Sequence, residues 1–297
     1  MNILWFPKEN MMKKMYEISK KYPILVGIVG FLVIYLSFMH TPSTPDQNSY
    51  ELSVLKIILS IACTGFIALI SGDKILVNSS NRTGYGILIG IPLIMINGTL
   101  SLIGLILDFI EAEPIVHGWF IKALLLAFSC LSLGFFEETL FRALINDAIL
   151  YQFRNKKGVF VAIAIISSFV FGILHVLGSD VHNFLTFLQA FLKTISCAMS
   201  GFLFLTIYWK THNIVACAII HALCDFIPSV STFLFSKYTE LDSYVLEGEM
   251  DYGAFKMDAG LTQSFGQIIQ IILTIIAFLI MLKFIKTIDF KKIREEW

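Results

Sequence analysis

Eight stretches of the chain are apolar for long enough to cross a lipid bilayer as helices. The hydrocarbon core is about 30 Å thick, so a spanning helix needs about 20 apolar residues. Inside lipid, a helix also satisfies its own backbone polar groups. We therefore predict an all-α, polytopic membrane protein with about eight transmembrane helices. The predicted spans are Ile24–Met39, Val54–Ser71, Gly86–Ile110, Gly118–Gly134 extending towards Leu150, Val159–Leu177, Phe184–Tyr208, Ile214–Phe235 and Phe265–Leu282.

The overall composition excludes an ordinary soluble domain. Hydrophobic residues make up 57% of the 297 residues and charged residues only 15%, whereas a soluble domain carries about 25% charged residues. The five cysteines lie in apolar runs without CxxC spacing, so neither a disulfide framework nor a zinc knuckle is predicted.

The distribution of basic residues predicts the orientation of the helices. Sixteen of the 22 Lys and Arg residues fall in five segments that eight spans would place on one side of the membrane. Cytoplasmic segments are enriched in Lys and Arg, so we expect both termini to be cytoplasmic. The five segments are the N-terminal tail, Lys74 with Arg82, the cluster from Arg154 to Lys157, Lys210, and the tail from Lys283 to Arg294.

The chain is predicted to form one transmembrane helical domain, residues 24–288, with its motif-bearing core at residues 120–235. Residues 1–23 form a cytoplasmic or interfacial segment, and both a helix on the membrane surface and a solvated tail fit its sequence. Residues 289–297 form a cytoplasmic tail. We expect Gly134 and the following acidic pair to break the fourth run into two helices.

Ionisable side chains inside the predicted spans are the strongest indication of function, because hydrocarbon disfavours them. The fourth predicted span contains the sequence Glu137-Glu138-x-x-x-Arg142. Glu138 and Arg142 are four residues apart, so they share a helix face and form a charge-assisted pair. Glu137 projects about 100° away and lacks this compensation. Such a carboxylate suits general-base chemistry.

Two further polar clusters lie in other predicted spans. Phe171-x-x-x-His175 ends the fifth run, and His221-x-x-x-Asp225 lies within the seventh. Each cluster also has a structural interpretation, because a histidine can be a hydrogen-bonded packing residue and the Glu138–Arg142 pair a buried salt bridge. His212, in contrast, lies at a predicted helix end and is expected at the membrane interface. Three proton-transferring clusters on three helices together favour a catalytic site.

The three motifs, in this order, resemble those of the CPBP family of CAAX proteases and bacteriocin-processing enzymes. This family includes the eukaryotic type II CAAX prenyl endopeptidases and bacterial relatives of the lysostaphin-resistance type. The resemblance implies a glutamate-dependent intramembrane endopeptidase without a metal or other cofactor. It implies that Glu137 and His175 hold and deprotonate the attacking water, and that His221 and Asp225 stabilise the oxyanion. Glu138 and Arg142 would orient the site and balance its charge.

Two features of the sequence depart from this expectation. The third motif of the family often ends in Asn, whereas here it ends in Asp225. An ionised Asp would repel an oxyanion, so Asp225 must be protonated or act by orienting His221. At about 1.5 Å per residue, His221 lies about 10 Å and His175 about 24 Å from the predicted cytoplasmic ends of their helices. We therefore expect one of the two helices to be offset, tilted or broken.

Three other functions fit the same residues. A zinc-dependent intramembrane protease would use His175, His221 and a Glu as ligands, although no HExxH motif is present. A catalytically inactive membrane regulator or immunity protein would keep the motifs without turnover. A transporter would use the carboxylates and histidines as a proton relay, although no pair of interrupted helices indicates an inverted repeat.

The resemblance implies a peptide or lipidated-peptide substrate within the bilayer, and prenylated CAAX peptides are the eukaryotic case. The bias towards Lys, Ile and Phe indicates a low-GC bacterium. Leader peptides, signalling peptides or bacteriocins at the bacterial plasma membrane are therefore the expected substrates of this multi-pass protein. No nucleic-acid partner is expected, and the sequence does not determine the oligomeric state.

Overall fold

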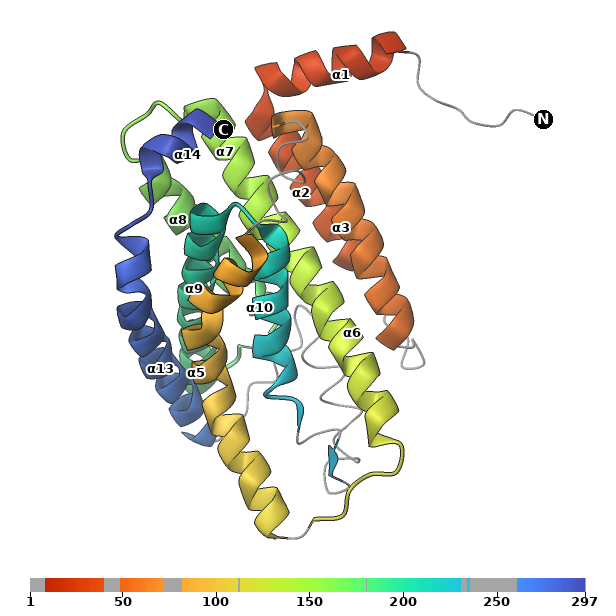
Figure 1. Cartoon of the computed structure of the whole chain (residues 1–297), viewed down its shortest axis with the longest axis vertical. Helices are drawn as coiled ribbons and strands as arrows, with labels where there is room; N and C mark the ends of the chain where they lie inside the picture. Colours follow the sequence, from red (N-terminus) through yellow and green to blue (C-terminus); the bar gives the residue numbers. More distant parts are fainter. Residues whose placement is uncertain are drawn as a thin grey trace, which may run out of the picture.

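The computed structural model describes residues 9–39, 49–71, 82–111, 113–179, 181–230, 234–235 and 261–296, and nearly all of these are helical. Within these residues no β-strand is formed, apart from an isolated bridge between Ile115 and Phe235. The predicted all-α fold is confirmed (Figure 1). The elements are α1 (Glu9–Lys21), α2 (Pro23–Met39), α3 (Ser49–Ser71), α5 (Thr83–Ile110), α6 (Trp119–Glu137), the π-helix η2 (Glu138–Leu144), α7 (Ile145–Phe153), α8 (Val159–Leu174), α9 (Phe184–Thr211), α10 (Ile214–Phe226), α13 (Leu261–Ile285) and α14 (Phe290–Glu296).

The helices have the lengths and composition of a multi-pass membrane protein. Among the described residues, four helices are long and apolar enough to span a bilayer, or five if the two halves of α5, bent by 45°, form one span. The shorter helices α2, α8 and α10 are also apolar. The membrane fold is therefore confirmed, whereas the number of eight spans remains a prediction.

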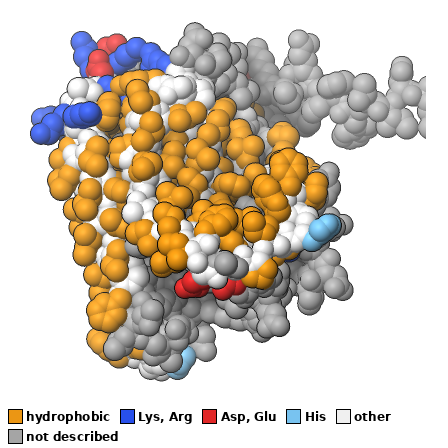
Figure 2. All heavy atoms as spheres, turned by 60° about the horizontal axis from the view of Figure 1, so that its bottom comes forward, with side chains coloured by type: hydrophobic (Ala, Val, Ile, Leu, Met, Phe, Trp, Pro, Cys, Tyr) orange, Lys and Arg blue, Asp and Glu red, His pale blue; other side chains and the backbone are white. Residues whose placement is uncertain are grey.

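Polarity is distributed as expected for a protein surrounded by lipid. Large apolar side chains are exposed on the outer faces of the helices, and Figure 2 shows them covering most of one face of the bundle. Charged and amide side chains, in contrast, are buried in the interior, including Glu138, Arg142, Asn146 and Asp147, each with no exposed surface. The unusual groups of this protein therefore lie inside the bundle.

Basic segments gather at one end of the bundle. The helix α1, the connection between α7 and α8, and α14 with the C-terminus lie at the same end (Figure 1). This placement agrees with the grouping expected from the sequence, but which side of the membrane it faces remains a prediction. The acidic segment 240–258, which we expect on the opposite side, and residues 1–8 of the N-terminal segment lie outside the described residues.

The expected break in the fourth run is wrong. Residues Trp119–Phe153 form one helix of 35 residues, in which the seven-residue η2 has π-helical hydrogen bonding. A π-helical turn accommodates an extra residue without ending the helix, and such turns are frequent at functional sites. The acidic pair Glu137 and Glu138 lies at the junction between α6 and η2.

The seventh predicted span, Ile214–Phe235, forms a shorter helix than predicted. The helix α10 ends at Phe226. Its start is fixed by Asn213, whose side-chain oxygen accepts a hydrogen bond from the backbone N–H of Ala216 at 2.9 Å. The amide of Asn213 donates to Thr83 Oγ1 at 2.8 Å, which joins the starts of α10 and α5. Such side-chain capping satisfies backbone N–H groups at a buried helix end.

Glycines allow α5 to pack closely against α10. A Cβ atom on Gly90 would lie 2.5 Å from the Ile220 side chain, and one on Gly86 would lie 2.6 Å from Ala216. Small residues drive the association of membrane helices by letting their backbones approach. This packing holds α10, which carries the third motif, within the bundle.

Candidate active site

His221 lies between the two glutamates of the first motif. Its Nδ1–H donates to Glu138 Oε1 at 2.8 Å, and its Nε2 is 3.4 Å from Glu137 Oε2. Glu137, Glu138 and His221 are all buried. Glu137 thus faces His221 and Glu138 contacts both His221 and Arg142, so the two carboxylates approach opposite edges of one imidazole.

Asp225 lies on the same side of the imidazole as Glu137. Its Oδ2 is 3.5 Å from His221 Nε2, and its side chain is 33% exposed, in contrast to the buried glutamates. The Phe204 ring stacks on the His221 ring with a centroid distance of 4.8 Å. The His221 ring is thus fixed by Glu138 at one edge and by an aromatic ring on its face. Its Nε2 is directed towards the carboxylates of Glu137 and Asp225.

Arg142 connects the two histidine-bearing helices. Its Nε is 3.3 Å from Glu138 Oε2, and both side chains are completely buried. The predicted Glu138–Arg142 pair is therefore present in the structure. The guanidinium group also lies over the Phe171 ring, 4.1 Å from its centroid. One cation thus contacts Glu138, which holds His221, and Phe171, which precedes His175 by one turn.

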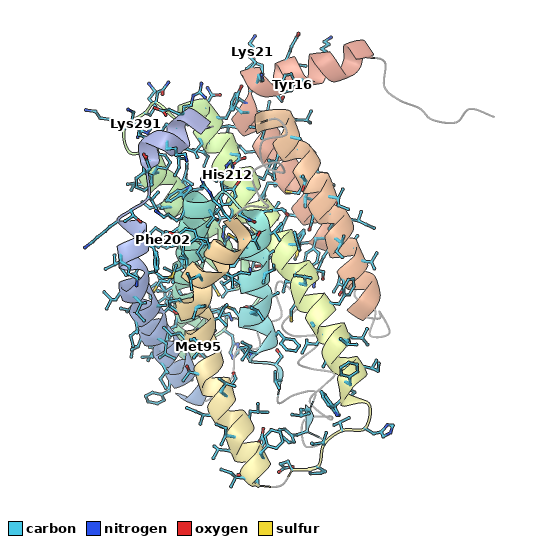
Figure 3. The ribbon with its side chains drawn as sticks, in the orientation of Figure 1. Tyr16, Lys21, Met95, Phe202, His212 and Lys291 are labelled. Atoms are coloured by element: carbon cyan, nitrogen blue, oxygen red, sulfur yellow. The ribbon has the colours of Figure 1, made fainter. Side chains whose placement is uncertain are left out.

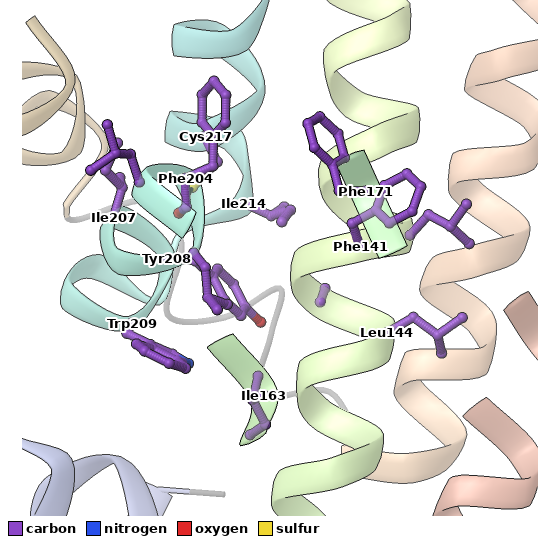
Figure 4. Packing of buried hydrophobic residues seen from close by; sticks show 14 of the residues in the cluster. Phe141, Leu144, Ile163, Phe171, Phe204, Ile207, Tyr208, Trp209, Ile214 and Cys217 are labelled. Atoms are coloured by element: carbon purple, nitrogen blue, oxygen red, sulfur yellow. Dashed lines mark hydrogen bonds between the residues drawn. The ribbon is translucent and has the colours of Figure 1, made fainter. Parts of the chain in front are cut away.

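His175 lies at the end of α8, next to the same aromatic ring. The centroids of His175 and Phe171 are 4.4 Å apart, and those of Phe171 and His221 are 6.2 Å apart. His175 Nδ1 is 2.7 Å from the carbonyl oxygen of Phe171. A carbonyl only accepts hydrogen bonds, so Nδ1 carries the proton in this arrangement and Nε2 of the neutral ring is an acceptor. Figure 4 shows Phe171 beside Phe141 of η2, against which it packs edge-on.

The structure brings the two histidines to the same region of the bundle. The ring centroids of His175 and His221 lie 4.4 Å and 6.2 Å from that of Phe171. The difference in depth estimated from the predicted helix ends therefore does not keep them apart. His212 lies at a helix end as expected, after the last residue of α9, and it is only 6% exposed. Its position at the membrane interface remains a prediction.

A buried lysine that the sequence interpretation overlooked belongs to the same region. Lys56 of α3 has no exposed surface, and its ammonium group interacts electrostatically with the carboxylates of Glu137 and Asp225. Lys56 lies only three residues into a predicted span, where a long basic side chain often extends to the interface. The helix α3 packs along α6, and this contact, which turns Lys56 inwards, is not visible in the sequence.

Charged side chains of both signs gather in this region. The carboxylates of Glu137, Glu138 and Asp225 lie around His221, Arg142 pairs with Glu138, and the buried Lys56 interacts electrostatically with Glu137 and Asp225. A third cation, Lys193 of α9, interacts electrostatically with His175. Within the described residues no group of three or more His, Cys, Asp and Glu side chains has a geometry that could hold a metal ion.

Comparison with protein families tests the resemblance. Residues 118–227 match the family model of the type II CAAX prenyl endopeptidases, Rce1-like. This segment is an Rce1-like domain. The match confirms the resemblance to the CAAX protease family drawn from the three motifs. Neither the curated proteins nor the solved structures that were searched gave a match.

The Rce1-like domain extends from the residue before α6 to the residue after α10. It contains all six residues predicted for the site, and it is similar to the type II CAAX prenyl endopeptidases over this segment. Lys56 lies outside the matched residues, on a helix that packs against the domain from the N-terminal side of the chain.

Gly134 permits the contact between α6 and α10 that brings the motifs together. A Cβ atom at this position would lie 2.6 Å from the backbone oxygen of Ala218 and 3.3 Å from the Cβ of His221. We expect Gly134→Ala to lower the free energy of unfolding by about 1–3 kcal/mol, because backbone atoms cannot yield cheaply. Thermal unfolding in detergent measures this loss. Gly104→Ala is the matched control, since no atom lies within 4 Å of its Cβ, and equal unfolding temperatures of the two variants would contradict the packing argument.

Proposed function

We propose that this protein is a glutamate-dependent, metal-independent intramembrane endopeptidase. In this proposal, Glu137 and His175 hold and deprotonate the attacking water, and His221 with Asp225 stabilises the oxyanion. Glu138 and Arg142 orient these groups. The observation that carries the proposal is the position of His221, which lies between Glu137 and Glu138 and near the Phe171 ring that also contacts His175.

The proposed reaction needs a base, an acid and a donor for the developing charge. Glu137 takes a proton from water as the water oxygen adds to the peptide carbonyl carbon. The carbonyl oxygen becomes negative and accepts a hydrogen bond from His221 Nε2. For this, His221 must carry protons on both ring nitrogens, because Nδ1 is bound to Glu138. Glu137 then gives its proton to the amine nitrogen as the carbon–nitrogen bond breaks.

The neutral His175 ring suits the role of water acceptor. Its Nδ1–H is bound to the Phe171 carbonyl, so Nε2 is the nitrogen that can accept a hydrogen bond from water.

We propose substrates in the membrane, either peptides or lipidated peptides. Leader peptides and bacteriocins processed at a bacterial plasma membrane fit the composition of the chain better than prenylated peptides do. The proposed topology has about eight spans and cytoplasmic termini, because this arrangement places the basic end of the bundle in the cytoplasm.

Lys56 offers an explanation for the acidic residue in the third motif. Asn at position 225 would be neutral, whereas Asp225 adds a negative charge close to the proposed oxyanion site. The buried Lys56 ammonium interacts with both Asp225 and Glu137, so it offsets that charge. Buried charges are tolerated only when they are compensated. Lys56 is in this proposal a positioning residue that makes Asp225 compatible with catalysis.

This pairing predicts a rescue. Lys56→Met leaves Asp225 with only the protonated His221 to offset its charge, so we expect the peptide-cleavage rate to fall by about 10-fold, equivalent to 1.4 kcal/mol. The double variant Lys56→Met with Asp225→Asn restores most of the rate, because both charges are removed. Rates are measured at equal amounts of folded protein in proteoliposomes. A double variant no more active than Lys56→Met would show that Lys56 does not act through Asp225.

The metal-independent mechanism is tested by incubating the purified protein in proteoliposomes with membrane peptides and a chelator. Cleavage that persists supports the glutamate mechanism, and cleavage that is lost with chelator and restored by Zn²⁺ supports a zinc protease. An inactive regulator is distinguished in cells, because Glu137→Gln and His175→Ala would then leave the biological effect of the protein unchanged.

A further inference from the structure

A polar cavity lies at the basic end of the bundle, away from the candidate active site. Its volume is about 380 Å³. It lies where the start of α5, the turn between α9 and α10, and the connection from α13 to α14 come together. The residues that line it are Arg82, Tyr85, Trp209, Lys210, His212, Thr287, Asp289, Lys292 and Ile293.

The charged groups of this cavity favour an anion. Arg82, Lys210 and Lys292 contribute three cations, and Asp289 contributes one carboxylate. Asp289 Oδ1 already accepts a hydrogen bond from the backbone N–H of Lys292 at 2.9 Å, as the cap of α14. The charge of the lining is therefore positive.

Hydrogen bonds between side chain and backbone hold the wall of the cavity in place. Lys210 Nζ donates to the carbonyl oxygen of Thr287 at 2.6 Å and to its hydroxyl at 2.8 Å. These bonds attach the end of α9 to the connection between α13 and α14. The buried His212 also lines the cavity. Figure 3 shows His212 further inside the bundle than Lys291 of α14, which lies at the outer surface.

Apolar surface suited to acyl chains lies directly next to this polar cavity. Along α5, Tyr85 of the lining is followed by the exposed side chains of Leu88 and Met95. On α13, which packs against α5, Leu279 and Ile280 are exposed just before the chain reaches Thr287. An amphiphile with an anionic head and apolar tails matches both surfaces.

We propose that this cavity binds the phosphate group of an anionic phospholipid. Phosphate oxygens accept hydrogen bonds from Arg and Lys, and basic pockets between membrane helices bind anionic headgroups. The bound headgroup bridges α5, the turn between α9 and α10, and α14. It therefore fixes the start of α10, the helix that carries His221 and Asp225. The binding itself does not depend on the protease proposal.

The test is a calorimetric titration of the full-length protein in uncharged detergent with short-chain phosphatidylglycerol. Short-chain phosphatidylcholine and inorganic phosphate are titrated separately. Each surface-located charge contributes about 1 kcal/mol to attraction for anionic lipid, so we expect Arg82→Gln and Lys292→Gln each to weaken phosphatidylglycerol binding by about five-fold. Lys291→Gln is the matched control, because Lys291 lies on the same helix as Lys292 but does not line the cavity.

The lipid site is supported if phosphatidylglycerol binds saturably and phosphatidylcholine does not. In that case Arg82→Gln and Lys292→Gln weaken the binding of phosphatidylglycerol, and Lys291→Gln leaves it unchanged. Inorganic phosphate that binds as tightly, with the same dependence on the variants, supports the phosphate site and identifies free phosphate as the ligand. Absence of saturable binding, or equal weakening by all three variants, overturns the proposal. Unfolding temperatures confirm that each variant is folded.

Discussion

Glu137→Gln is expected to lower the rate of peptide cleavage by about 10²- to 10⁴-fold, the usual contribution of a general base. The amide has nearly the same shape as the carboxylate but cannot accept the proton of water. Glu137 is buried and faces His221 Nε2 at 3.4 Å, so its removal acts at the centre of the proposed site. The rate is measured with purified protein in proteoliposomes on a peptide that the wild type cleaves.

Glu111→Gln is the control for this substitution. It makes the same chemical change at an exposed residue that follows α5, outside the site. The control variant should cleave at the wild-type rate. If Glu137→Gln cleaved as fast as Glu111→Gln while folding normally, Glu137 would have no role as the base.

Arg142→Met is expected to have the largest effect on stability, lowering the free energy of unfolding by about 3–5 kcal/mol. Removing one partner of a buried ion pair leaves the other charge uncompensated. Glu138 would lose the guanidinium 3.3 Å from its carboxylate, and Phe171 would lose the cation over its ring. The measurement is equilibrium unfolding of the purified protein in detergent.

A second variant separates lost charge balance from lost packing. In Arg142→Met with Glu138→Gln both charges are absent, so we expect it to be more stable than Arg142→Met alone. Arg154→Met, at an exposed position after α7, should be close to the wild type. Equal stabilities of Arg142→Met and Arg154→Met would show that the ion pair contributes nothing to the fold.

Candidate residues for the site could be selected from the sequence because ionisable residues stand out in apolar segments. Glu138 and Arg142 pair as their spacing predicts, and the motif order led to the family that the comparison confirms. Hydrocarbon penalises a charge wherever it occurs, so such a residue is informative without any knowledge of packing.

Features that depend on contacts between helices could not be predicted in this way. The burial of Lys56 follows from the packing of α3 along α6, and that of His212 from the segments that cover the turn between α9 and α10. The helical continuity through Glu137 and Glu138 depends on a π-helical turn, which hydropathy does not distinguish from a break.

The central claim is that a glutamate buried in the membrane hydrolyses peptides, and a comparison of membrane peptides tests it most directly. Cells producing either the wild type or Glu137→Gln at equal levels are extracted, and their membrane peptides are identified by mass spectrometry. We expect specific fragments in the wild type, with their uncut precursors accumulating in the variant. Identical peptide sets from the two strains would contradict the assignment of this protein as a protease.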